Sequence, residues 1–306
     1  MAKKPLPVAC AIDREYAAPL LVTLISAVEY LDPGCEIQLY LSHENLDERT
    51  IARISQLVDV HIIEWGRDKF DVLRRHHRYP AVAAFPLLLP ELLPSTLDRV
   101  LFLDADLLIL DDLARLWEVS TAGRALAAAP DGAIHLCSSP RGVKFCDEWG
   151  VAEGSTYFNC GVMLIDLEAW RNREVTRRAC NYLNRAGDQA DFLHQQALNA
   201  VLWSDWQRLD QRWNLLASVA GRAYGQPASG FSETPGIVHF AGRFKPWRAP
   251  VGGPYYAQYR EFLSKALQGT TPVPGTLRDH ILSLYDRYLR DSLYRCERVL
   301  WNHGLF

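Results

Sequence analysis

The sequence predicts an α/β fold, with a mostly parallel central sheet, helices on both faces and a helical tail at the C-terminus. Three observations lead to this prediction. Residues 7–63 alternate apolar runs with stretches of helical spacing, in the order β-α-β-α-β. Several apolar runs stop at an aspartate, as buried parallel strands do at their carboxyl ends. Hydrophobic residues make up 49% of the chain and charged residues 23%, which is the composition of a soluble globular protein.

The N-terminal part of the chain supplies the first parallel strands. A helix follows the first apolar run and ends where Asp32-Pro33-Gly34 interrupts its spacing, since proline and glycine disfavour a helix interior. Strands that are joined through helices run parallel, with right-handed crossovers. We therefore expect strands at Pro7–Ile12, Ile37–Leu41 and Val60–Ile63, and helices at Tyr16–Tyr30 and Asp47–Leu57.

The middle of the chain continues the pattern with further strands and two helices. The stretch Ala81–Leu93 is largely apolar, which predicts a well-buried helix. A second, longer helix is expected at Asp188–Trp203. The remaining strands are expected at Arg99–Leu103, Ala125–Ala129, Tyr157–Asp166 and Ile237–Phe240.

A change of composition at residues 269–275, which are rich in glycine, proline and threonine, predicts a hinge. It divides the chain into a domain of residues 1–268 and a tail of residues 269–306. Within the tail, Leu277–Trp301 has the spacing of an amphipathic helix. Three roles are open for this helix: packing on the domain, peripheral contact with a membrane surface, or self-association.

Charge and cysteine content limit the classes of partner and compartment. Lys and Arg number 33 against 36 Asp and Glu, a net charge of -3, so we expect no nucleic-acid partner. No window reaches about 18 uncharged apolar residues, and the N-terminus lacks the pattern of a signal peptide. The seven cysteines are scattered without a C-x-x-C pair, which favours a reducing compartment. We expect a cytoplasmic protein, with peripheral contact at the inner membrane surface as an option.

Two acids at the end of a central strand form the first chemical motif, Asp104-Ala105-Asp106. Ligands bind parallel α/β sheets at the carboxyl ends of the strands. Residues two apart in a strand share a face, so both carboxylates can hold one hard divalent cation. The alternative is a pair of solvated acids that cap the strand.

A second motif begins at His239, at the end of the last predicted strand, and includes Gly242 and Lys245. The imidazole can supply a third metal ligand, although this ligand set does not select the metal. The lysine can reach a diphosphate as a point charge, and the glycine lets backbone approach it closely. The alternative is a buried core histidine beside an exposed loop.

Five short motifs occur in a fixed order along the chain. They are Asp13-Arg-Glu-Tyr16, a Leu-Leu-Leu-Pro-Glu-Leu-Leu-Pro run over residues 87–94, Leu103-Asp-Ala-Asp106, Phe158-Asn-Cys-Gly161-Val, and His239-x-x-Gly-x-x-Lys-Pro-Trp247. Together they resemble the family 8 glycosyltransferases, the group of glycogenin and of bacterial lipopolysaccharide galactosyltransferases and glucosyltransferases. The resemblance spans residues 7 to about 262.

This resemblance implies a GT-A fold, which has a Rossmann-like sheet, and a retaining transfer of glucose or galactose from a UDP-sugar. The implied cofactor is Mn²⁺, with Mg²⁺ as the alternative ion. The implied acceptor is a glycan, a lipid-linked saccharide or a protein, as in lipopolysaccharide or glycan biosynthesis in bacteria. No carboxylate nucleophile stands out at the matching position, which favours a same-face substitution assisted by the leaving diphosphate, with a double displacement as the alternative.

The resemblance also implies roles for individual residues. The metal ligands would be Asp104, Asp106 and His239. The nucleotide would be held by Ala11, Ile12, Asp13, Tyr16 and Ala105, and the diphosphate by Gly242 and Lys245. The donor sugar and its anomeric centre would face Asp131, Asn159, His194 and Gln195. Asn199 is expected to support its helix rather than to contact substrate.

Two positions depart from the family pattern. His194 stands where the family signature has an aspartate that helps hold sugar hydroxyls, and Pro86 stands where an arginine commonly precedes the Leu-rich run. Proline offers no side-chain donor, and it disfavours a helical conformation at Phe85. These departures leave open a degenerate member that binds nucleotide-sugar or a partner without turnover. A dinucleotide-dependent oxidoreductase is disfavoured, because no G-x-G-x-x-G follows the first strand.

Overall fold

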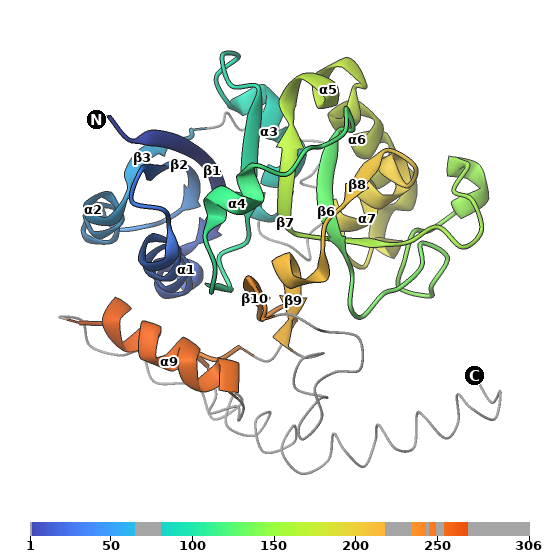
Figure 1. The fold of residues 1–306 in the computed structure, drawn as a ribbon. Coiled ribbons are helices and arrows are strands. Elements are labelled where there is room, and N and C mark those ends of the chain that lie inside the picture. The colour runs from blue at the N-terminus through green and yellow to red at the C-terminus, as the bar shows by residue number, and fades with distance from the viewer. Residues whose placement is uncertain (1, 65–80, 218–233, 243–244, 249–253, 269–306) are drawn as a thin grey trace, which may run out of the picture.

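A computed structural model of the chain describes residues 2–64, 81–217, 234–242, 245–248 and 254–268 (Figure 1). The hinge predicted at residues 269–275 and the amphipathic helix predicted at 277–301 lie outside the described residues. None of the helices within the described ranges combines the length and the apolar character needed to cross a membrane.

The core of the molecule is a seven-stranded sheet with the order β3-β2-β1-β4-β7-β6-β8. β7 runs antiparallel to both of its neighbours, and all other neighbouring pairs are parallel, so the sheet is largely parallel as predicted. The strands are β1 (Lys4–Asp13), β2 (Cys35–Glu44), β3 (Asp59–Ile62), β4 (Arg99–Leu103), β6 (Leu126–Pro130), β7 (Phe158–Asp166) and β8 (Trp206–Arg208).

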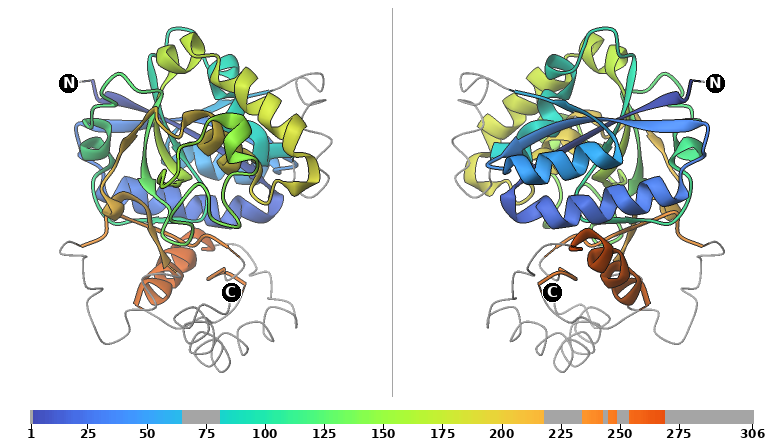
Figure 2. Two further views of the ribbon diagram at one scale, coloured as in Figure 1. Left: turned by 90° about the vertical axis from the view of Figure 1, so that its right-hand side faces the viewer. Right: turned by 90° about the vertical axis from the view of Figure 1, so that its left-hand side faces the viewer.

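Helices cover both faces of this sheet (Figure 2). Successive side chains of a strand point to opposite faces, so Ala9 of β1 packs in one core while Val8 and Cys10 pack in the other. One core lies under α3 (Phe85–Leu92), α5 (Leu167–Asn172), α6 (Val175–Ala186) and α7 (Leu193–Leu202). The other lies under α1 (Ala17–Tyr30), α2 (Glu48–Leu57), α4 (Leu113–Trp117) and α9 (Pro254–Ala266).

A second, three-stranded sheet has the order β5-β10-β9 and consists of β5 (Leu107–Ile109), β10 (Ile237–His239) and β9 (Leu215–Leu216). β5 begins directly after Asp106, and β10 pairs with it in antiparallel fashion, with His239 opposite Leu107. The backbone N–H of Phe240 donates to the Asp106 carbonyl at 3.0 Å. This small sheet therefore brings the end of β10 to the end of β4, although about 130 residues separate them in the chain.

Two predicted helices are shorter in the structure. The expected helix at 188–203 begins only at Leu193; Gly187–Gln189 forms a separate 3-10 helix, and the Asp191 N–H donates to the Gln196 side chain instead of to a helical carbonyl. The expected helix at 81–93 consists of a 3-10 helix, η3 (Ala81–Ala84), followed by α3. Pro86 was expected to disfavour a helical conformation at Phe85, but Phe85 is the first residue of α3. Pro86 lies in the first turn of α3, where a helix needs no backbone N–H.

Candidate active site

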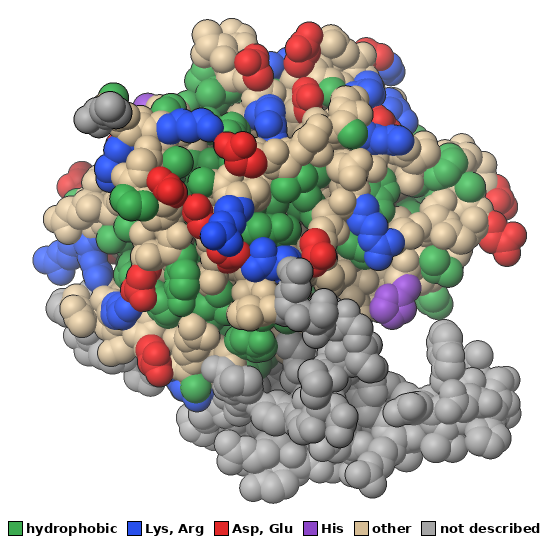
Figure 3. All heavy atoms as spheres, viewed as in Figure 1, with side chains coloured by type: hydrophobic (Ala, Val, Ile, Leu, Met, Phe, Trp, Pro, Cys, Tyr) green, Lys and Arg blue, Asp and Glu red, His purple; other side chains and the backbone are tan. Residues whose placement is uncertain are grey.

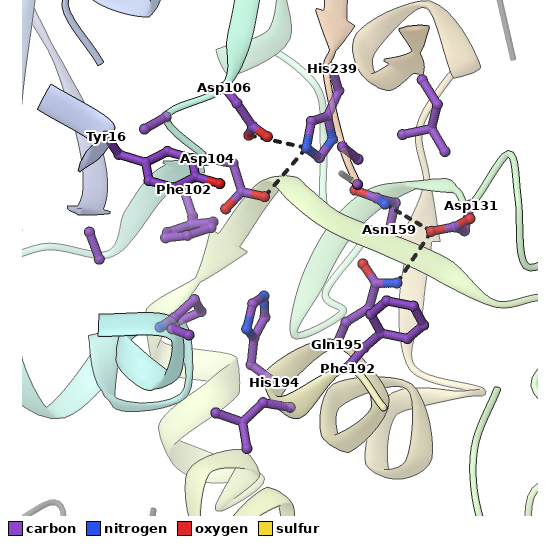
Figure 4. A pocket seen from close by; sticks show the side chains of 18 of the residues that line it. Tyr16, Phe102, Asp104, Asp106, Asp131, Asn159, Phe192, His194, Gln195 and His239 are labelled. Atoms are coloured by element: carbon purple, nitrogen blue, oxygen red, sulfur yellow. Dashed lines mark hydrogen bonds and ion pairs between the residues drawn. The ribbon is translucent and has the colours of Figure 1, made fainter. Parts of the chain in front are cut away.

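A cavity of about 570 Å³ opens at the carboxyl ends of β1 and β4. It is the place where a parallel α/β sheet binds ligands. All fourteen residues that the sequence predicted for the site line it: Ala11, Ile12, Asp13, Tyr16, Asp104, Ala105, Asp106, Asp131, Asn159, His194, Gln195, His239, Gly242 and Lys245. Figure 4 shows ten of the cavity's residues by name and how their side chains point toward a common space.

Asp104, Asp106 and His239 converge at one end of this cavity (Figure 4). The His239 Nε2 atom lies 3.3 Å from an oxygen of Asp106 and 3.6 Å from an oxygen of Asp104. One ligand atom from each residue lies within 4.8 Å of the other two. The side chains of Asp106 and His239 are buried, whereas that of Asp104 is 33% exposed toward the cavity.

Charges in this cluster shift one another's pKa. Burial alone would raise the pKa of the Asp106 carboxyl, but Lys245 and His239 outweigh burial and hold it well below its usual range. Burial raises the pKa of Asp104 to about 6; His239 opposes this rise and the charge of Asp106 adds to it. A divalent cation between the carboxylates would favour the ionised form of Asp104, because a positive neighbour stabilises the carboxylate.

The surroundings of His239 fit a metal ligand. Its Nδ1 atom lies 3.0 Å from Oδ1 of Asn214, which can only accept, so Nδ1 carries a proton, and in the neutral ring Nε2 is the acceptor that faces the two carboxylates. Gly161 lies directly against this cluster. An added Cβ at Gly161 would lie 2.3 Å from the His239 ring and 2.9 Å from an Asp104 oxygen. Two carboxylates and one imidazole are donors that suit a divalent ion such as Mn²⁺ or Mg²⁺. The residues present therefore fit a metal.

Lys245 is buried beside these acids. Its ammonium donates to Asp106 Oδ2 and, at 2.9 Å, to the Phe240 carbonyl. It also lies 5.7 Å from the ring centre of Tyr16 and 5.4 Å from that of Trp247. Gly242, between His239 and Lys245, adopts a positive φ of 87°, which glycine tolerates without strain.

The side of the cavity at which the sequence predicts nucleotide binding is formed by the end of β1 and the turn that follows it. Asp13 uses one carboxylate oxygen to accept from the Glu15 and Tyr16 N–H groups, and this contact caps the turn before α1. Tyr16 meets Trp247 edge to face, with ring centres 5.5 Å apart. Ala11, Ile12 and Ala105 line the same part of the cavity. The aromatic ring and the carboxylate are groups that can contact a base.

A chain of hydrogen bonds runs from the Asp104–Asp106–His239 cluster to α7. Asn214, which holds His239, donates to Asn159 Oδ1 at 2.8 Å, and Asn159 donates to Asp131 at 2.8 Å. Gln195 donates to the same Asp131 oxygen at 3.2 Å and accepts from the Cys160 N–H at 3.0 Å. Asp131, Asn159 and Gln195 are thus held in one rigid arrangement.

The two departures from the family pattern lie on the wall of this same cavity. His194 lies in α7 and Pro86 in α3, and both line the cavity with Val82 and Ala83 of η3. Burial lowers the pKa of His194 to about 4, against a smaller upward effect of a hydrogen bond to the backbone of Ala83. The His194 imidazole is therefore neutral at pH 7.

Sequence analysis missed three residues that shape the site. Asn214 and Arg141 belong to no motif, and Phe192 directly precedes α7. Arg141 and Phe192 line the cavity, and the Arg141 guanidinium lies 4.6 Å from the centre of the Phe192 ring. Gly161 was part of a quoted motif but was given no role. Asn199 does what the sequence predicted: its side chain bonds the Phe158 N–H and carbonyl and the Gln195 carbonyl.

The cavity, its acid–acid–histidine cluster and the surrounding fold can now be compared with known proteins. A family model for glycosyl transferase family 8 matches residues 7–250. The chain belongs to this family. It is 28% identical over 287 residues to general stress protein A of Bacillus subtilis, which covers 88% of this chain and 96% of that protein.

Two further comparisons are at lower sequence identity. The chain is 22% identical to lipopolysaccharide 1,2-glucosyltransferase of Escherichia coli, over 79% of this chain and 72% of that protein. Among solved structures, an active-site mutant of LgtC superposes with a TM-score of 0.71 at 21% identity, over 90% of this chain and 99% of that one. LgtC, a galactosyltransferase, has also been solved with donor and acceptor sugar analogs, and that structure superposes with a TM-score of 0.69, over 88% of this chain and 98% of that one. The protein is thus a family 8 sugar transferase with the GT-A fold.

Proposed function

We propose that this protein is a retaining glycosyltransferase that moves a sugar from UDP to a saccharide or glycoconjugate acceptor and needs a divalent cation. The observation that supports it most is the meeting of Asp104, Asp106, His239 and Lys245 at one end of a cavity whose nucleotide side holds Asp13 and Tyr16. Mn²⁺ is the proposed ion. Glucose and galactose are the donor sugars that the family resemblance implies. The cytoplasmic location and the role of the C-terminal helix stay predictions of the sequence.

The proposed reaction breaks the anomeric C–O bond to the diphosphate and forms a new C–O bond to an acceptor hydroxyl on the same face. A cation bound at the cluster would neutralise the charge that develops on the leaving diphosphate. Lys245 adds a fixed positive charge at the same place, and because it is buried, its field is weakly screened by water. The acceptor proton passes to an oxygen of the leaving phosphate.

The state of Asp131 supports a same-face substitution over a double displacement. Each of its oxygens already accepts two hydrogen bonds, from the Ala133 and Ile134 N–H groups and from the Asn159 and Gln195 amides. A carboxylate with all four acceptor positions occupied is a poor nucleophile, because an attack must first break some of these bonds. Gln195 is an amide and carries no charge, so in this proposal it positions the sugar.

A degenerate member that binds nucleotide-sugar without turnover is the second candidate. This candidate is favoured by two uncharged residues that line the cavity, His194 and Pro86. At these positions the family pattern has an aspartate and an arginine. The two candidates share the metal and nucleotide site and differ in bond cleavage. Release of UDP from a UDP-sugar, with water or a saccharide mixture as acceptor, distinguishes them.

The first experiment is calorimetry of UDP binding with and without Mn²⁺. We expect binding that depends on Mn²⁺ and is lost in the double variant Asp104→Asn/Asp106→Asn. The matched control is Asp147→Asn/Asp188→Asn, which removes the same two charges from exposed positions. If wild type binds no UDP under either condition, both candidates fail; if both double variants bind like wild type, the metal site is elsewhere.

A further inference from the structure

The place of the donor sugar within the cavity follows from its covalent link to the diphosphate, and here the inference rests on the function proposed above. The diphosphate belongs next to the Asp104–Asp106–His239 cluster, so the sugar must lie within one ring length of it. Figure 4 shows that His194 and Gln195 point from α7 into the space on the other side of the cavity from Asp104. The sugar therefore lies between the cluster, Asp131 and the wall formed by Val82, Ala83, Pro86 and His194.

The polar side chains at this place have few hydrogen-bond acceptors left for a sugar. Asp131 already accepts four hydrogen bonds. Asn159 Oδ1 accepts from both the Gly161 N–H and Asn214. The amides of Asn159 and Gln195 each donate one N–H to Asp131, and each has a second N–H. The hydrogen-bonding groups of these side chains that are still available to a sugar are therefore mostly donors.

The opposite wall is apolar and uncharged. Val82 and Pro86 are buried carbon surfaces, and among the described lining residues of this wall none is charged. Burial lowers the pKa of the His194 imidazole to about 4, so the ring is neutral at pH 7 and one of its two nitrogens carries a proton. In the neutral imidazole the other ring nitrogen is then an acceptor. The wall therefore has one hydrogen-bond acceptor, the unprotonated nitrogen of His194, and apolar side chains surround it.

These features suit an acetamido group better than a bare hydroxyl. An unsubstituted hexose presents several hydroxyl hydrogens, and each one that is buried without an acceptor costs binding energy. An acetamido group has one N–H donor, one carbonyl acceptor and one methyl. Those three parts match the unprotonated ring nitrogen of His194, the second amide N–H of Asn159, and the carbon surface of Val82 and Pro86.

We propose that the donor-sugar subsite selects an N-acetylhexosamine, and that His194 with the η3–α3 wall sets this preference. The donor would then be a UDP-N-acetylhexosamine rather than UDP-glucose or UDP-galactose. This narrows the proposed function to one class of donor and leaves the nucleotide and metal site as described.

The decisive experiment is calorimetry of wild-type protein with Mn²⁺ and five ligands: UDP, UDP-N-acetylglucosamine, UDP-N-acetylgalactosamine, UDP-glucose and UDP-galactose. We expect at least one of the two acetylated donors to bind roughly tenfold or more tightly than its unsubstituted counterpart, the range that one apolar group in a fitted pocket supplies. If UDP binds and the unsubstituted donors bind equally well or better, the inference is overturned while the proposed function stands. If UDP itself does not bind, the proposed function fails first.

Two variants test the role of His194. His194→Asp replaces the single acceptor by a carboxylate that accepts hydroxyl hydrogens, so the ratio of acetylated to unsubstituted affinity should fall at least fivefold. His194→Gln keeps a neutral side chain and is the matched control, with a smaller expected change. The ratio of affinities for acetylated and unsubstituted donors is measured within one variant, and both affinities are normalised to the affinity of that variant for UDP. A general loss of stability therefore does not change the ratio. An unchanged ratio in His194→Asp would assign the preference to other residues.

Discussion

The Nδ1 atom of His239 lies 3.0 Å from the side-chain oxygen of Asn214, and this contact decides which nitrogen of the ring faces Asp104 and Asp106. Asn214 is itself fully buried and donates its amide to Asn159. The ring is therefore fixed both in tautomer and in direction before any cation arrives. A ligand that is held in place in this way loses little freedom when it binds metal.

Replacing Asn214 by alanine should weaken metal binding without removing a ligand. The Nδ1 proton of His239 would lose its acceptor, and the ring could turn or change tautomer. We expect the Kd for Mn²⁺ to rise roughly 10–100-fold, as for other residues that orient metal ligands. Calorimetry with Mn²⁺ measures this, and Asn184→Ala, at an exposed position of α6, is the control. A Kd within twofold of wild type would show that His239 is held by other contacts.

Gly161→Ala should disrupt the Asp104–Asp106–His239 cluster, because residue 161 lies directly against it. The new Cβ would lie 2.3 Å from His239 Cε1 and 2.9 Å from Asp104 Oδ2, closer than such atoms approach. We expect a folded protein with little or no Mn²⁺ binding, because both ligands must move apart. Circular dichroism establishes folding, and the electron paramagnetic resonance signal of free Mn²⁺ reports binding. Wild-type affinity in a folded variant would contradict the geometry described for this cluster.

Lys245→Met should show how much of the affinity for UDP comes from its diphosphate and how much from its nucleoside. The methionine has a similar length but no charge, so UDP should bind at least tenfold more weakly while uridine binds as to wild type. Loss of the buried partner of Asp106 should also lower the free energy of unfolding of the metal-free protein by about 3 kcal/mol. Calorimetry with UDP and uridine, and thermal melts, measure the two effects. Equal weakening for both ligands would place Lys245 outside the diphosphate site.

His194 should make the protein less stable in mild acid. Its folded-state pKa is lowered to about 4, below the ordinary value of 6.5, so between these values the unfolded chain binds more protons than the folded one. Stability is then lost as the pH falls from about 6.5 toward 4. At pH 5 this amounts to about 1–2 kcal/mol relative to His194→Gln, allowing for the partial exposure of the ring. Thermal melts of wild type and His194→Gln at pH 7.5 and 5 give the difference in their free energies of unfolding, and this difference should change by the same amount between the two pH values. A difference that stays constant would mean that His194 is not held neutral.

Much of the fold and of the candidate site could be predicted from the sequence. The apolar runs that end at Asp13, Asp104 and Asp131 mark strand ends, and the strand ends of a parallel sheet meet at one edge. The five motifs identified the family, and the family model confirms it. These features depend on neighbours along the chain, which is why spacing and residue type are enough to find them.

Other features were decided only by the tertiary structure. β7 runs antiparallel to β4 and β6, a direction that the residues of β7 do not indicate on their own. Asn214 meets His239 across 25 positions, through the pairing of β9 with β10. The wall that brings Pro86 and His194 to one cavity joins α3 to α7, more than a hundred residues apart. Such contacts are set by which strands pair and which helices pack, and the free energy that selects them belongs to the whole folded chain and not to any local stretch.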